Sequence, residues 1–173
     1  MILSLTGFMG SGKTTVGRIV ADALGCPYFD LDDIIVKKAG KTIPSIFADD
    51  GESAFRSLEA SCLQSFIKKY AESTVVLSLG GGTLGNPASA SLVHDKTLCI
   101  YLRASEDTLR ERLKGTEASR PLLKGTSPVM TDDGLSMLLS SRIHTYESVS
   151  AITLDTDGLT PDQIADEIII DCR

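Results

Sequence analysis

The segment from Gly7 to Thr14, which reads Gly-Phe-Met-Gly-Ser-Gly-Lys-Thr, constrains this chain more than any other feature. It matches the pattern G-x-x-x-x-G-K-[ST], in which glycines let the backbone wrap around phosphates so that successive N–H groups point inward. An apolar stretch, Ile2–Thr6, precedes it, and an amphipathic stretch with an apolar stripe from Val16 to Leu24 follows it. Average glycine usage gives such a pattern by chance in about one chain in a hundred. The segment therefore predicts a phosphate-binding loop between a strand and a helix.

Residue chemistry within this loop predicts the ligand. Lys13 can supply a point charge to the β- and γ-phosphates of a nucleotide, and the hydroxyl of Thr14 can ligate Mg²⁺. The first turn of the following helix adds its positive dipole end. The loop by itself therefore predicts binding of a nucleotide together with Mg²⁺.

Short apolar runs alternate with helical patterns along the rest of the chain. The predicted strands are Ile2–Thr6, Tyr28–Asp30, Thr74–Leu79, Thr97–Leu102 and Ala151–Leu154. Helical stripes run over Val16–Leu24, Phe55–Tyr70 and Leu135–Tyr146, and Thr160, Pro161 and Gln163 predict the start of a last helix. This alternation predicts an α/β fold with a parallel sheet and right-handed crossovers. Ligands should then bind beyond the carboxyl ends of the strands.

Composition limits the partners and the compartment. The net charge of −6, from 17 basic and 23 acidic residues, argues against a general nucleic-acid surface. No apolar run approaches the roughly 20 residues that span a bilayer, and the first residues lack the basic region of a signal peptide. Four scattered cysteines indicate free thiols in a reducing compartment. We expect a cytoplasmic protein without nucleic-acid or membrane partners.

Two acidic residues follow the second predicted strand. Alternation would put Asp30 and Asp32 on the same side of an extended segment, where one carboxylate could hold Mg²⁺ through water and the other could meet a substrate hydroxyl. A helix N-terminus, where the dipole favours acidic residues, is an equal alternative.

Three further motifs have both a functional and a structural interpretation. Arg56 and Glu59 could form a solvent-exposed ion pair on a helix, or Arg56 could bind an anionic acceptor. The run Gly80-Gly81-Gly82 could bring backbone amides close to a ligand, or could be a flexible turn. Arg120 lies in a segment rich in glycine, proline and basic residues, about 114–127, which is predicted to be a mobile lid.

Together these elements resemble the shikimate kinase family over essentially the whole chain. The resemblance rests on an ordered set: Gly7–Thr14, Asp30-x-Asp32, Gly51-Glu52-x-x-Phe55-Arg56-x-x-Glu59, Gly80-Gly81-Gly82, and Arg120-Pro121-Leu122-Leu123 followed by Arg142-x-x-x-Tyr146. It implies a single domain, 1–173, with a three-layer α/β/α fold and a five-stranded parallel sheet of order 2-3-1-4-5. It also implies a lid at about 114–127 and a substrate-binding helical segment at about 31–70.

The resemblance further implies transfer of the ATP γ-phosphate to the 3-hydroxyl of shikimate by a monomer. The residues implied to hold the nucleotide are Gly10, Ser11, Gly12, Lys13, Thr14, Thr15, Arg112 and Arg120. Those implied for Mg²⁺ are Thr14 and Asp30, and those for shikimate are Asp32, Arg56, Gly80, Gly81, Gly82 and Arg142. Lys13, Asp32 and Arg120 are the implied catalytic residues.

Two rival functions are less consistent with the sequence. An adenylate or gluconate kinase shares the loop but would not be expected to carry both the Gly80–Gly82 run and the paired arginines. A nucleotide-binding regulatory module without catalysis would bind nucleotide tightly and show no acceptor-dependent turnover.

Overall fold

Five parallel strands form one sheet in the computed structural model, which describes residues 1–114 and 132–172. They are β1 (Ile2–Thr6), β2 (Tyr28–Asp30), β3 (Val75–Ser78), β4 (Leu98–Arg103) and β5 (Ile152–Asp155). Their order in the sheet is β2-β3-β1-β4-β5, and every neighbouring pair is parallel. The predicted parallel sheet and its strand order are therefore confirmed, with the last three strands beginning one residue later than predicted.

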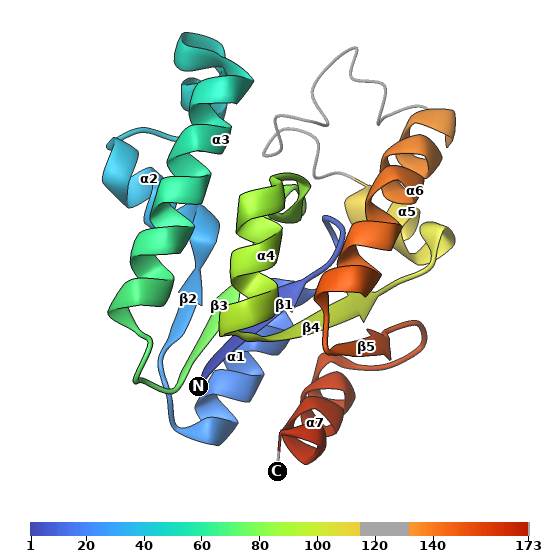
Figure 1. Ribbon diagram of the computed structural model, residues 1–173. Helices are drawn as coiled ribbons and strands as arrows, with labels where there is room; N and C mark the ends of the chain where they lie inside the picture. Colours follow the sequence, from blue (N-terminus) through green and yellow to red (C-terminus); the bar gives the residue numbers. More distant parts are fainter. Residues whose placement is uncertain (115–131, 173) are drawn as a thin grey trace.

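Helices cover both faces of the sheet (Figure 1). On one face lie α1 (Lys13–Leu24) and α7 (Pro161–Asp171), which pack against each other. On the other lie α3 (Ile43–Lys69), α4 (Pro87–Lys96) and α6 (Asp132–Val149). The shorter elements pack at the edges of these layers: α2 (Leu31–Ala39) against α3, α5 (Glu106–Leu113) against α6, and the 3₁₀ turn η1 (Thr83–Gly85) against α4. The molecule thus has the three layers that the resemblance implies.

Side-chain alternation along the strands divides the core in two. Leu3 and Leu5 of β1 belong to the cluster under α1 and α7, whereas Cys99 and Tyr101 of β4 belong to the cluster under α3, α4 and α6. All four are almost completely buried. Because successive strand residues point to opposite faces, strands that are apolar at nearly every position fill both clusters.

One helix start differs from the prediction, and one is confirmed. The helix predicted from Phe55 begins at Ile43 and is interrupted at Gly51, whose φ of 84° favours glycine. The predicted start of α7 is confirmed, because Thr160 and Gln163 form the capping box.

Within residues 1–114 and 132–172, no helix is long and apolar enough to cross a membrane. All four cysteines are free thiols, and each is buried or half-buried.

Candidate active site

A cavity of about 530 Å³ opens at the carboxyl ends of β1, β2 and β3. It gathers most of the residues that the sequence predicted, although these are far apart along the chain: Gly10, Gly12, Lys13, Thr14, Thr15, Asp30, Asp32, Arg56, Gly80, Gly81, Gly82, Arg112 and Arg142. Ser11, a buried residue of the same loop, does not line the cavity. Arg120, and all of the predicted lid except Lys114, lie outside the described residues.

The phosphate-binding loop has the backbone geometry that its glycines permit. Gly10 and Gly12 adopt φ values of 84° and 95°, in the left-handed region that side chains disfavour. Gly12 is the N-cap of α1, so the first N–H groups of that helix face the cavity. The Lys13 ammonium folds over the loop and donates to the carbonyl oxygens of Gly7 and Phe8, each at 2.9 Å. These features build a compact, positively polarised anion site.

The interpretation of Asp30 to Asp33 as an extended segment is wrong, because the helix alternative holds. The strand ends at Asp30, and α2 begins at Leu31 with Asp30 as its N-cap. One carboxylate oxygen of Asp30 accepts from the backbone N–H of Asp32 at 3.0 Å, and this bond satisfies a free donor of the first turn. Both carboxylates nevertheless line the cavity, since the first turn of α2 projects into it.

The second oxygen of Asp30 faces the loop. It accepts from the hydroxyl of Thr14 at 3.2 Å and from the hydroxyl of Tyr28 at 3.3 Å. A hydroxyl and a carboxylate oxygen this close are hard oxygen donors of the kind that Mg²⁺ prefers. Among the described residues, no three His, Cys, Asp or Glu side chains form a metal cluster. Thr14 and Asp30 thus present two oxygen atoms at one place beside the loop.

Asp32 lies in an environment that disfavours its charge. Burial is the main cause that raises the pKa of Asp32 to about 6, and the nearby carboxylates of Asp30 and Glu59 raise it further. Lys13 acts in the opposite direction. A carboxyl group with a pKa close to neutrality can exchange a proton with a substrate hydroxyl, which suits it for general base catalysis.

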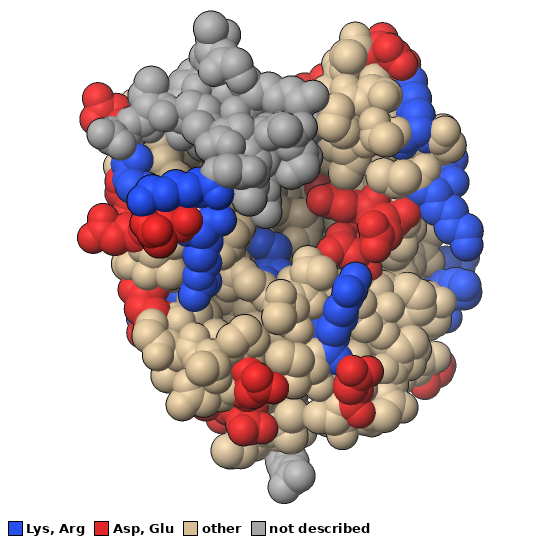
Figure 2. Space-filling model, turned by 180° about the vertical axis from the view of Figure 1, so that it is seen from behind, with Lys and Arg blue, Asp and Glu red and all other residues tan. Residues whose placement is uncertain are grey.

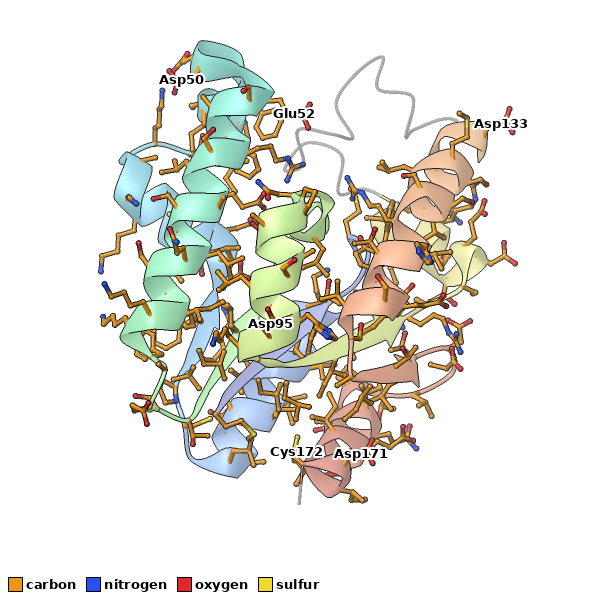
Figure 3. All side chains as sticks on the ribbon, in the orientation of Figure 1. Asp50, Glu52, Asp95, Asp133, Asp171 and Cys172 are labelled. Atoms are coloured by element: carbon orange, nitrogen blue, oxygen red, sulfur yellow. The ribbon has the colours of Figure 1, made fainter. Side chains whose placement is uncertain are left out.

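The ion pair of Arg56 with Glu59 is not solvent-exposed. The guanidinium of Arg56 donates to Glu59 at 2.9 Å, and the Glu59 side chain is only 3% exposed. The hydroxyl of Thr83 donates to the other oxygen of Glu59 at 2.8 Å. Glu52, labelled beside α3 in Figure 3, has a carboxylate oxygen 3.6 Å from Nε of Arg56. These contacts fix Arg56 against the cavity wall.

The glycine run is a close-packed wall and not a flexible turn. A Cβ atom built on Gly82 would lie 2.6 Å from the guanidinium of Arg56, and one on Gly81 would lie 3.5 Å from the guanidinium of Arg142. The carbonyl oxygen of Gly81 accepts a short hydrogen bond from the hydroxyl of Tyr146. Two arginines from different helices thus pack directly on consecutive glycines.

Arg142 has spare hydrogen-bonding capacity. Its Nη1 atom is buried and has no hydrogen-bond partner among the described residues, while its guanidinium lies 5.6 Å from the ring centroid of Phe8. Buried polar groups are normally paired, so this donor indicates a place for an anionic ligand group.

Arg112 lies at the nucleotide end of the cavity. It donates to the carbonyl oxygen of Gly10 at 3.3 Å. Nearby, the backbone N–H of Ser105 donates to Asp157 at 3.0 Å and is the main cause that lowers the pKa of Asp157, with a smaller contribution from the charge of Arg112. This hydrogen bond joins the loop after β5 to the N-cap of α5, the helix that carries Arg112.

Sequence reasoning missed the apolar part of the cavity and one buried acid. Met9, Ile43, Phe47 and Phe55 line it, and the rings of Phe47 and Phe55 are 4.7 Å apart across the break at Gly51. Glu59 was noted within a motif but was not assigned to the site. Its buried position could not be read from an i, i+3 spacing that is equally common on helix surfaces.

A nucleotide loop with an acceptor cavity beside it, at the carboxyl edge of a 2-3-1-4-5 parallel sheet, defines the class: a P-loop kinase of a small molecule. A sequence model described as shikimate kinase matches residues 9–173. The chain is 41% identical to a shikimate kinase of Limosilactobacillus fermentum, over 98% of this chain and 94% of that protein. It is 38% identical to one of Enterococcus faecalis, over 95% and 94%. The chain belongs to the shikimate kinase family.

The solved structures agree with this assignment. A shikimate kinase from Acinetobacter baumannii in complex with shikimate superimposes with a TM-score of 0.90 at 31% identity, covering 99% of this chain and 92% of that one. A sugar kinase from Janibacter, at 18% identity and a TM-score of 0.57, shares only the fold.

Proposed function

We propose that the cavity described above transfers the γ-phosphate of ATP to the 3-hydroxyl of shikimate. The backbone of Gly10 to Thr15 and the Lys13 ammonium are the groups that would hold the phosphates. Phosphoryl transfer depends mostly on positioning and charge stabilisation, which a rigid loop, a helix N-terminus and a lysine can provide.

Thr14 and Asp30 are the residues that would hold Mg²⁺, Thr14 directly and Asp30 through water. Their oxygen atoms lie 3.2 Å apart, so the two groups converge on one position beside the loop. A bound Mg²⁺ would neutralise charge on the β- and γ-phosphates.

Asp32 would accept a hydrogen bond from the acceptor hydroxyl and take its proton as the new bond to phosphorus forms. Its pKa of about 6 leaves it mostly ionised at neutral pH, while keeping it basic enough to assist. Its place in the first turn of α2 fixes the carboxylate next to the phosphate loop.

Arg56 and Arg142 would bind the carboxylate of shikimate, with the backbone of Gly80, Gly81 and Gly82 against the ring. The buried Nη1 atom of Arg142, which has no hydrogen-bond partner within residues 1–114 and 132–172, is the single observation that carries this proposal furthest. A guanidinium pairs with a carboxylate through two parallel hydrogen bonds, and this geometry favours an acceptor that carries a carboxylate group. A gluconate or adenylate kinase would not be expected to combine these two arginines with the run Gly80-Gly81-Gly82.

Two roles and the cellular setting rest on the family resemblance. Arg112 would stack on adenine, and Arg120 would close with the lid and stabilise charge in the transition state. We also infer a cytoplasmic monomer.

The test is to identify the product. The purified chain is incubated with Mg·ATP and shikimate, and the product is examined by ³¹P and ¹H NMR. A single phosphate ester on the 3-hydroxyl, coupled to the ring proton at that carbon, is expected. An ester at another hydroxyl would contradict the placement of Asp32. ATP binding without any ester would favour the regulatory module.

A further inference from the structure

A second cavity, of about 550 Å³, lies between β2, α2 and α3, behind the first turn of α2. Its floor is aromatic. The ring of Phe29 lies 5.1 Å from that of Phe66 and 4.9 Å from that of Tyr70, and the rings of Phe66 and Tyr70 are 4.6 Å apart. Ile34 and Cys62 complete the apolar lining. A concave apolar space of this volume is typical of small-molecule sites.

The rim of this cavity is basic. Its cationic side chains are all exposed: Arg18, Lys37, Lys38 and Lys69. Within the described part of the chain, none of the four forms an ion pair. Lys38 donates to the hydroxyl of Ser61, and Arg18 and Lys69 lie over the rings of Tyr28 and Tyr70. Two carboxylates, Asp30 and Asp33, also line the space. Cations therefore outnumber acids here, although the whole chain carries a net charge of −6.

Figure 2 shows the arrangement of charge on this side of the molecule. Lysine and arginine side chains run down the right-hand edge, where α2 and α3 lie when Figure 1 is seen from behind, next to an acidic cluster. Such a local positive field on an acidic protein attracts small anions.

The second cavity is separate from the active site. Of the described residues that line either cavity, only Asp30 lines both. Its oxygen atoms are already occupied by the hydroxyls of Thr14 and Tyr28 and by the N–H of Asp32. A ligand in the second cavity would therefore contact the outer side of the wall that Asp30 forms, and would not replace nucleotide or acceptor.

We propose that this second cavity binds a small aromatic carboxylate. An aromatic ring fits the floor of Phe29, Phe66 and Tyr70, because offset and edge-to-face ring contacts are favourable. The carboxylate then reaches the ammonium groups of Lys37 and Lys69 at the rim, neither of which forms an ion pair among the described residues. An inorganic anion would leave the apolar floor exposed to water, and a neutral ring would leave the cations unused.

The test measures binding of 2-naphthoate to the full chain by isothermal titration calorimetry. The titration is made once without other ligands and once with saturating shikimate and ADP. Binding at one site per chain is expected, with weaker binding of naphthalen-2-ylmethanol, which lacks the charge, and of cyclohexanecarboxylate, which lacks the aromatic ring. Equal binding of the alcohol, or loss of naphthoate binding when shikimate and ADP are present, would overturn the proposal.

Matched variants locate the site. Ser65 lines the cavity and is exposed, whereas its neighbour Gln64 is exposed and does not line it. Ser65→Trp should fill the space and abolish naphthoate binding, while Gln64→Trp should not. Lys69→Ala should raise the Kd about threefold, and Lys68→Ala, one residue away and outside the cavity, should leave it unchanged.

The lysine pair keeps the proposal testable if Ser65→Trp does not fold. Equal affinities of Lys69→Ala and Lys68→Ala would contradict the site. Concentration-dependent dimerisation in sedimentation, without naphthoate binding, would instead identify the cavity as a contact between two copies of the chain.

Discussion

The guanidinium of Arg56 lies so close to the backbone of Gly82 that a Cβ atom at this glycine would be 2.6 Å from Nη2 and 2.8 Å from Nη1. Glu59 holds the guanidinium from the other side through its hydrogen bond at 2.9 Å. A side chain at position 82 would therefore displace the end of Arg56 and disturb its pair with a buried carboxylate. Gly82 leaves the space in which the guanidinium of Arg56 lies.

Gly82→Ala should raise the KM for shikimate by about tenfold, because the displaced guanidinium loses part of a charge-assisted contact. Steady-state kinetics at saturating ATP measures this change. Gly85→Ala is the matched control, since a Cβ there meets no atom within 4 Å. Similar KM values for the two variants would show that the close approach of Arg56 is irrelevant to substrate binding.

Arg142→Leu should weaken shikimate binding more than ATP binding. The lost guanidinium carries the unpaired Nη1 atom, and a hydrogen bond to a charged group contributes about 1.5–3 kcal/mol. We expect the KM for shikimate to rise at least about tenfold while the KM for ATP stays within about twofold. A rise confined to the KM for ATP would contradict the assignment of Arg142 to the acceptor.

Asp32→Asn should lower kcat by about a hundredfold or more, because an amide cannot accept the proton of the acceptor hydroxyl. Asp33→Asn is the control: Asp33 is the adjacent, exposed residue of the same helical turn and does not line the active-site cavity. Circular dichroism would verify that both variants are folded. Near-normal turnover by Asp32→Asn would remove Asp32 from the chemistry.

The same carboxylate should make stability depend on pH. Because the pKa of Asp32 is raised from 3.8 to about 6 on folding, its protonation stabilises the fold below about pH 4, and this stabilisation is lost as pH rises through about 6. Since the side chain is partly exposed, we discount the contribution to about 1–2 kcal/mol.

Urea unfolding of the natural chain and of Asp32→Asn, at about pH 4.5 and about pH 8, tests this dependence. From the lower to the higher pH the natural chain should lose the contribution of Asp32, and the variant has none to lose. The free energy of unfolding of the variant, minus that of the natural chain, should therefore rise by about 1–2 kcal/mol. A constant difference between the two proteins would show that the carboxyl group of Asp32 titrates normally.

Much of the architecture could be predicted from the sequence, because local patterns determine it. Continuous apolar runs predicted buried parallel strands, and Thr160 with Gln163 predicted the start of α7. By contrast, α4 was missed: it is built largely of small and polar residues without a clear apolar stripe, so only Asn86 and Pro87 signal its start. The strand order came from the family resemblance, since spacing alone does not specify which strands are neighbours.

The polar residues of the site could be predicted from the sequence, but its apolar lining and the burial of Glu59 could not. A motif identifies Lys13 or Asp32 by chemical type, but burial depends on contacts between segments far apart in the chain. Glu59 illustrates this limit, because only the tertiary fold brings Thr83 onto it. The extended interpretation of Asp30 to Asp33 was wrong for a related reason. A short acidic side chain at the end of a strand can cap a helix. Asp30 does so, and the chain continues as α2 and not as an extended segment.

The most direct test of the central claim is ADP release by the purified chain with Mg·ATP, measured with shikimate, gluconate or AMP as acceptor and without any acceptor. We predict release that depends on shikimate alone and that disappears in Lys13→Ala, which removes the charge held over the phosphate loop. Release stimulated by gluconate or AMP, or no acceptor-dependent release despite nucleotide binding, would contradict the proposed function.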